Sequence, residues 1–170
     1  MKLTELLKEI ELLAQKKGFS TPYIVGGLPR DKVLNRANSF GDIDITTGDD
    51  GVKHLAKEVA INFHKYVTNY MVMSDGHAQV SFGDLKMDFS SNFIMPGVAY
   101  LLRKSGVSNV TEMQKEIYSR DFTCNTLLMD FALKEVKDPT GKGVKDINDK
   151  IIRTCLSPAL SLGFNDRVGS

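Results

Sequence analysis

Two aspartates, Asp42 and Asp44, stand two positions apart in the apolar run DIDIT. In a β-strand, residues i and i+2 project from the same face, so both carboxylates point one way, about 7 Å apart along the strand. The intervening isoleucines project from the other face, which we expect to be core. Two adjacent carboxylates repel each other unless a cation lies between them. The pattern therefore predicts a site for Mg²⁺, a hard cation that also binds phosphate oxygens.

A pair of glycines, Gly26 and Gly27, follows the apolar run 23–25, and Arg30 and Asp31 come three and four residues later. Glycines at the end of a strand let the backbone approach a ligand closely and expose N–H groups to phosphate. Neither a Walker A loop nor the GxGxxG dinucleotide pattern is present. The pair is thus either a simple tight turn or a phosphate-binding turn.

A third acid, Asp88, lies in the run LKMDF, with apolar residues on the alternate face. On a strand next to DIDIT, its carboxylate would complete a two-metal site and could help to deprotonate an attacking hydroxyl. The alternative is a charge at a strand edge.

The segment SRDFTCNTLL places three further polar side chains close together, namely Arg120, Asp121 and Asn125. A guanidinium such as that of Arg120 can bind a phosphate through two N–H groups. Asp121 and Asn125 can contact a ribose or fix the loop. An internal ion pair with a helix cap explains the same residues without a ligand.

Helices and strands must position these candidate residues relative to one another. Apolar periodicity predicts helices over 4–17 and 51–64, and Pro29 predicts the start of a short helix. The expected strands are 23–25, 42–46, 66–73, 78–82 and 85–90. Residues 97–120 are expected to be partly helical, 121–133 to be helix or strand, and 138–154 to hold a turn, a short polar segment and a final strand-like run. This order predicts an α/β (α+β) fold, with a mixed β-sheet and flanking helices.

Length and composition indicate one globular domain, or one domain and part of another. The chain has 170 residues, of which 42% are hydrophobic, so it can bury a substantial core. Its net charge of +1 offers no broad basic surface for nucleic acid. Any RNA contact is therefore expected to be local or to lie outside this sequence.

Cys124 and Cys155 lack the spacing of a zinc site and are expected to be buried free thiols, which favours a reducing, cytoplasmic setting. No apolar run is long enough for a membrane span, so we expect no membrane partner. Met71 and Met73 share a strand face and are expected to fill the core.

Four segments occur in order along the chain: YIVGGLPRDKVLNR, GDIDIT, SRDFTCNTLL and KDPTGKGVKDINDKIIRT. With them the chain resembles, over roughly residues 20–160, the head domain of class II tRNA nucleotidyltransferases (CCA-adding enzymes) and bacterial poly(A) polymerases. These belong to the polymerase-beta-like nucleotidyltransferases. The resemblance implies a catalytic head over 1–155 and the start of a neck segment over 156–170. The rest of the neck, and the body and tail that bind tRNA, are not expected in this sequence.

The resemblance also implies an activity. A nucleotide from CTP or ATP is added to an RNA 3′-hydroxyl, most often the tRNA 3′ end, with two Mg²⁺ ions that Mn²⁺ can replace. Asp42, Asp44 and Asp88 match the metal-binding and catalytic acids. The residues that match the nucleotide-binding positions are Gly26, Gly27, Arg30, Arg120, Asp121 and Asn125.

Some alternatives remain open. One is a non-catalytic nucleotide- or RNA-binding module with the same fold, and another is an enzyme that modifies a protein or a small molecule. The product of an RNA-modifying enzyme could be CCA, a lone A, C's only or a poly(A) tail. Ser119 stands where the family has the first of two arginines. Further domains or a partner chain are expected to supply the neck and body.

Overall fold

The computed structural model describes residues 1–36, 41–90 and 94–156. Within them the chain forms six α-helices, a short 3₁₀-helix and seven strands. The elements in order are α1 (Leu3–Lys16), β1 (Tyr23–Val25), α2 (Gly27–Val33), β2 (Asp42–Thr46), α3 (Gly51–Asn62), β3 (Asn69–Val72), β4 (Ala78–Phe82), β5 (Leu85–Phe89), α4 (Val98–Lys104), α5 (Glu112–Tyr118), η1 (Thr123–Asn125), β6 (Leu128–Met129), β7 (Val136–Lys137) and α6 (Gly143–Asn148).

The strands form one sheet in the order β3-β4-β5-β2-β1-β6-β7. The β2–β5 pair is parallel, and the other neighbouring pairs are antiparallel. The sheet is therefore mixed, as predicted. Its one parallel pair is the pair that carries the three candidate acids, so the topology brings them together.

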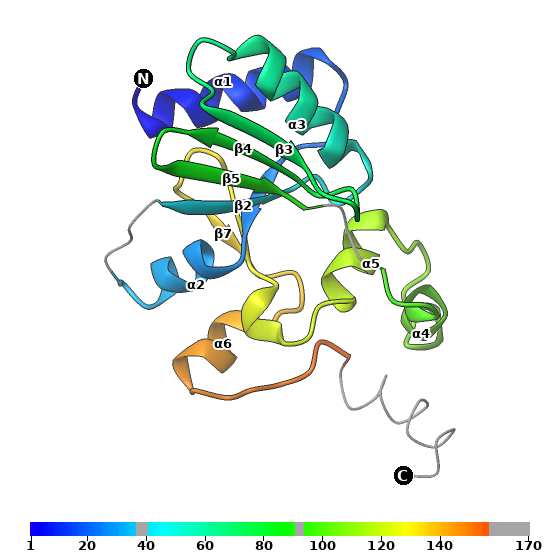
Figure 1. Cartoon of the computed structure of the whole chain (residues 1–170). Helices are drawn as coiled ribbons and strands as arrows, with labels where there is room; N and C mark the ends of the chain where they lie inside the picture. Colours follow the sequence, from blue (N-terminus) through cyan, green and yellow to red (C-terminus); the bar gives the residue numbers. More distant parts are fainter. Residues whose placement is uncertain (37–40, 91–93, 157–170) are drawn as a thin grey trace.

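Helices α1 and α3 cover one face of the sheet (Figure 1). Ile43 and Ile45 of β2 have no exposed surface and pack in the main core with residues of both helices, such as Leu7 and Leu55. The aspartates that alternate with these isoleucines project from the opposite face. The main core thus fixes which face of β2 carries the acids.

Helix α5 lies on the acid-bearing side and is held there by packing and by its cap. Ile117 is buried in a small cluster with Val25 and Leu128. At the helix start, Thr111 Oγ1 accepts a hydrogen bond from the Gln114 amide (3.1 Å), and Gln114 Oε1 accepts one from the Thr111 amide (2.9 Å). This capping box fixes the start of the helix that leads into Arg120.

Three details differ from the sequence expectations. Met71 and Met73 are 43% and 39% exposed, because Met71 lies in the edge strand β3, whose four residues are all exposed, and Met73 directly follows that strand. The expectation that they fill the core was wrong. The polar segment after residue 138 contains α6, and the run after it makes only an isolated bridge, between Phe122 and Thr154. Helix α2 begins at Gly27, two residues before Pro29.

Of the proposed neck segment 156–170, all but Leu156 lies outside the described residues. Among the helices described, none combines the length and the apolar character needed to cross a membrane.

Candidate active site

The three candidate acids share one face of the β2–β5 pair. Asp44 is the register partner of Asp88 across the parallel strands, and Asp42 lies two residues before Asp44. Asp42 is exposed, whereas Asp44 and Asp88 are half-buried. The Asp88 carboxylate accepts a hydrogen bond of 2.9 Å from Gln79 Nε2, which orients it from the neighbouring strand β4.

Asp44 lies at the electrostatic centre of this group. Its pKa is raised above the ordinary value of 3.8, chiefly by burial and next by the negative charge of Asp88, with Asp42 adding to the rise. The positive charge of Arg120 acts in the opposite direction. Ionised Asp44 is thus disfavoured in the folded chain unless further positive charge is supplied.

The glycine turn lies directly against Asp44. Gly26 has a φ of +80°, a conformation that favours glycine, and a Cβ at this position would lie 2.7 Å from Asp44 Oδ2. Gly27, the first residue of α2, would bring a Cβ to 3.4 Å from Arg30 Nη2. The turn, the acid and the Arg30 guanidinium therefore occupy one small region. Arg30 Nε is also 3.8 Å from Asp31 Oδ1.

Arg120 approaches the acids from the far end of α5. Its Nη2 is 3.0 Å from Glu116 Oε1, and its Nη1 is 3.5 Å from the Asn125 carbonyl oxygen. The second carboxylate oxygen of Glu116 accepts a hydrogen bond of 2.8 Å from Thr46 Oγ1 on β2. The internal ion pair considered as an alternative for Arg120 is thus present. The Arg120 side chain is nonetheless 25% exposed, and its positive charge acts to lower the pKa of Asp44.

Asp121 and Asn125, the other two polar candidates of the segment SRDFTCNTLL, differ in exposure. Asp121 is exposed, and its carbonyl accepts a 3.2 Å hydrogen bond from the Cys155 amide. Asn125 is half-buried in η1 and contacts Arg120 through its carbonyl oxygen.

Cys124 and Cys155 are free thiols, half-buried and buried respectively. Burial raises the pKa of the Cys155 thiol to about 12, so it stays protonated at neutral pH.

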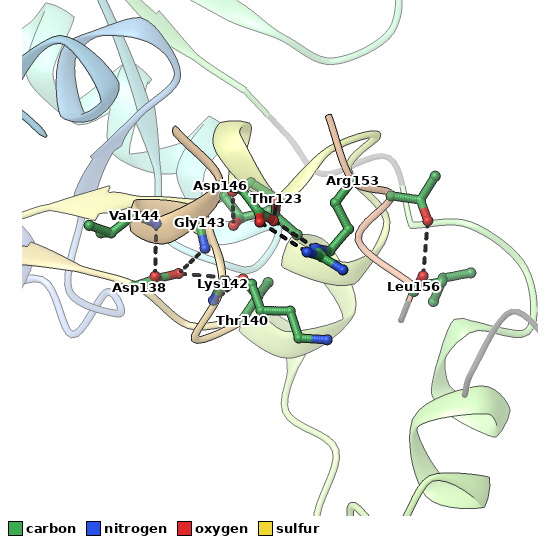
Figure 2. A network of polar contacts seen from close by, with 11 residues as sticks. Thr123, Asp138, Thr140, Lys142, Gly143, Val144, Asp146, Arg153 and Leu156 are labelled. Carbon is green, nitrogen blue, oxygen red and sulfur yellow. Dashed lines mark hydrogen bonds and ion pairs between the residues drawn. The ribbon is translucent and has the colours of Figure 1, made fainter. Parts of the chain in front are cut away.

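Residues 137–154, the last of the four segments that carry the family resemblance, hold η1 in place. Figure 2 shows Asp146 of α6 between Thr123 and Arg153. Asp146 Oδ2 accepts hydrogen bonds from Thr123 Oγ1 (2.7 Å) and Arg153 Nε (2.9 Å). The Asp138 carboxylate accepts hydrogen bonds of 3.0 Å from the Gly143 and Val144 amides at the start of α6. This network fixes η1, and η1 in turn supplies the carbonyl that contacts Arg120.

The acids supply some, but not all, of the ligands that a hard divalent cation needs. Their ligand atoms are carboxylate oxygens, and a Cβ on Gly26 would fill the space beside Asp44. Within the described residues, however, no group of three or more acids, histidines or cysteines is arranged to hold an ion. An ion bound here must therefore draw other ligands from water or phosphate, which is the usual coordination of Mg²⁺.

Three residues of the site were missed from the sequence. Glu116 of α5 stands four residues before Arg120, which lies just beyond the end of the helix, and this i, i+4 spacing indicates an ion pair. Gln79 lies opposite Asp88 in a hairpin, which a strand register would have revealed. Thr46 follows Asp44 at the i+2 spacing that puts both on one face of β2.

With this geometry described, comparison with known proteins identifies the family. Residues 22–153 match the family described as "Poly A polymerase head domain". Since the match spans most of the chain, the protein belongs to this family. The resemblance to class II CCA-adding enzymes and poly(A) polymerases, and the α/β nucleotidyltransferase fold, are thereby confirmed.

Individual relatives agree. The chain is 32% identical over 142 residues to a CCA-adding enzyme of Staphylococcus aureus (strain Newman), which covers 82% of this chain and 32% of that enzyme. A solved tRNA-processing enzyme in an apo form superposes with a TM-score of 0.65 at 26% identity, covering 98% of this chain and 40% of that one. A tRNA nucleotidyltransferase complexed with a primer tRNA and an incoming ATP analog gives a TM-score of 0.61 at 26% identity, covering 91% and 40%. The chain spans about a third of the length of the curated relatives that it matches.

Proposed function

We propose that this chain is the catalytic head of an RNA nucleotidyltransferase, which transfers a nucleoside monophosphate from CTP or ATP to an RNA 3′-hydroxyl. The observation that carries the proposal is the juxtaposition of Asp44 with Asp88 across β2–β5 and with Gly26 across β1–β2. A binding module gains little from adjacent acids that repel each other. A phosphoryl-transfer enzyme uses the same acids to hold the cations that neutralise a triphosphate.

Asp42, Asp44 and Asp88 are the proposed metal ligands, for two Mg²⁺ ions or for Mn²⁺ in their place. When bound, the ions lower the pKa of the RNA 3′-hydroxyl and stabilise charge on the departing pyrophosphate. The protein's own contribution is placement. Gln79 orients the Asp88 carboxylate, which is suited to assist removal of the hydroxyl proton.

The triphosphate is proposed to lie against the turn at Gly26 and Gly27. Arg30 and Arg120 are the proposed guanidinium donors, which suits the negative charge of the phosphates. Asp121 and Asn125 are proposed to orient the sugar. None of the residues assigned here is proposed to contact the base, so this proposed machinery is the same for every nucleoside triphosphate.

The proposed acceptor is the 3′ end of tRNA. The CCA-adding relatives and the solved complex with a primer tRNA support this choice. A net charge of +1 is small for a tRNA-binding surface, so further domains or a partner chain are proposed to hold most of the tRNA. The free thiols suit a reducing cytoplasm, which is the proposed location.

Transfer of labelled CTP or ATP to a short RNA primer, in Mg²⁺ or Mn²⁺, tests the proposal. We expect extension of the primer by the wild-type chain and none by Asp42→Ala. Triphosphate binding without turnover would instead indicate a non-catalytic module. Label that appears on protein or on a small molecule, and not on RNA, would place the chain among enzymes with a different acceptor.

A further inference from the structure

Glu116 is a buried acid to which the proposed chemistry assigns no part. Its side chain is 4% exposed, although carboxylates are rarely buried unless they are paired. It lies on α5, the helix whose C-terminal end leads to Arg120. Such burial is costly, so its partners indicate what it is for.

The two oxygens of Glu116 contact two different elements. Oε1 binds the Arg120 guanidinium at 3.0 Å, and Oε2 accepts a hydrogen bond of 2.8 Å from Thr46 Oγ1. Thr46 has no exposed surface and follows Asp44 by two residues on β2. The carboxylate therefore connects the arginine to the strand that carries the acids.

This connection matters because Arg120 has more than one carboxylate within electrostatic reach. Through Glu116 the guanidinium is linked to Thr46 of β2, which lies only two residues after Asp44 on the same face of the strand. A guanidinium free to move would pair with the nearest available carboxylate, and a pair with Asp44 would occupy a proposed metal ligand. The contact with Glu116 holds one edge of the guanidinium and leaves other N–H donors for a phosphate.

We propose that Glu116 is a positioning residue, which fixes Arg120 at a set distance from β2 so that the guanidinium binds the triphosphate rather than Asp44. This inference rests on the proposed function, because it assigns Arg120 to the triphosphate. It requires Glu116 to act on nucleotide binding through Arg120. A purely structural ion pair would affect only the stability of the fold.

The test compares Glu116→Gln with Glu112→Gln. Glu112 lies on the same helix, is exposed and pairs with Lys115, so it controls for loss of an acid from α5. We expect Glu116→Gln to raise the KM for the triphosphate about tenfold, the size of one charge-assisted contact, with a smaller change in kcat. Glu112→Gln should keep the wild-type KM.

A double-mutant cycle tests whether the effect passes through Arg120. In an Arg120→Ala background, Glu116→Gln should cause no further rise in KM. An equal rise in both backgrounds would overturn the proposal, because Glu116 would then act independently of the arginine. Thr46→Val, which cuts the link to β2 from the other side, should raise KM in the same direction and serves if Glu116→Gln does not fold.

A second measurement separates this inference from the proposed function. Arginine side-chain NMR of the chain without nucleotide should show an Arg120 guanidinium with slow rotation and protected N–H protons, both lost in Glu116→Gln. Failure of the wild-type chain to extend RNA would refute the proposed function but leave this readout intact. An Arg120 signal unchanged in a folded Glu116→Gln protein would refute the positioning role.

Discussion

Single side chains in this site are constrained most tightly where β1 meets α2. Gly26 combines a positive φ with a close approach to Asp44, so any side chain there would press on the acid. Asp44 itself is disfavoured as an anion by burial and by Asp88. Both features lower the stability of the protein without ligand, and they serve the proposed function only when a cation and a triphosphate are bound.

Asp44→Asn is expected to abolish nucleotide transfer without unfolding the protein. The substitution removes a charge that repels its cross-strand partner Asp88, so the free energy of unfolding should stay equal or rise by about 0.5–1 kcal/mol. Primer extension and urea unfolding measure the two effects. Near-normal turnover by the variant would show that Asp44 is not a metal ligand.

Gly26→Ala is expected to destabilise the fold by about 1–3 kcal/mol, because alanine disfavours a φ of +80° and ψ of −135°. Its Cβ would also displace the Asp44 carboxylate, so transfer should be lost. Gly83→Ala is the matched control. Gly83 also has a positive φ, but a Cβ there meets no atom within 4 Å. If both variants lose stability and both keep activity, the turn does not serve the site.

The position of Asp42 and Asp44 on one face of a strand was predictable from the sequence, because strand alternation alone sets it. Neither Glu116 nor Gln79 was predicted. The role of Glu116 depends on a contact between elements distant in the chain, its link to Thr46 across 70 residues, and the role of Gln79 depends on the register of the β4–β5 hairpin. Spacing rules report neighbours within one helix or strand and cannot report these contacts.

Among the helices and strands, α6 shows how tertiary contacts override local propensity. Its sequence, GVKDIN, begins with glycine and has no amphipathic pattern long enough to predict a helix. The Asp138 carboxylate supplies the hydrogen bonds that its first amides need, and Asp146 anchors it to Thr123 and Arg153. For a related reason the exposure of Met71 and Met73 was missed, since period-two alternation does not reveal which strand forms the edge of a sheet.

The Asp146–Arg153 pair predicts a specific dependence of stability on pH. The hydrogen bond from Arg153 is the main cause that lowers the pKa of Asp146 below its ordinary value of 3.8. A lowered carboxyl pKa means that the folded state favours the ionised form. The stabilisation is therefore complete above pH 3.8 and is lost as the pH falls below it, through the folded-state pKa.

We accordingly expect Asp146→Asn to lower the free energy of unfolding at pH 7, since it removes the charged partner of Arg153. The difference from wild type should shrink as the pH falls below 3.8. Urea unfolding of both proteins at pH 7 and at acid pH measures this. Asp149→Asn, an exposed position at the end of the same helix, is the control. A difference that is constant with pH would show that the charge of Asp146 is unimportant.

Considered as a whole, the chain matches a poly(A) polymerase head domain over residues 22–153 and spans about a third of the length of its curated relatives. Its proposed nucleotide-binding side chains address phosphate, metal and sugar. From this we expect ATP and CTP to bind the 170-residue chain with dissociation constants within roughly threefold of each other. Isothermal titration with non-hydrolysable analogues measures both. A preference above about tenfold would show that a base-reading group lies within this chain.

The most direct test of the account is a crystal structure of the chain with Mg²⁺ and a non-hydrolysable triphosphate analogue. We predict metal density bridging the carboxylates of Asp42 and Asp44 to phosphate oxygens, with the triphosphate against the turn at Gly26 and Gly27. A triphosphate bound elsewhere, with these two carboxylates directed to solvent and no metal between them, would contradict it.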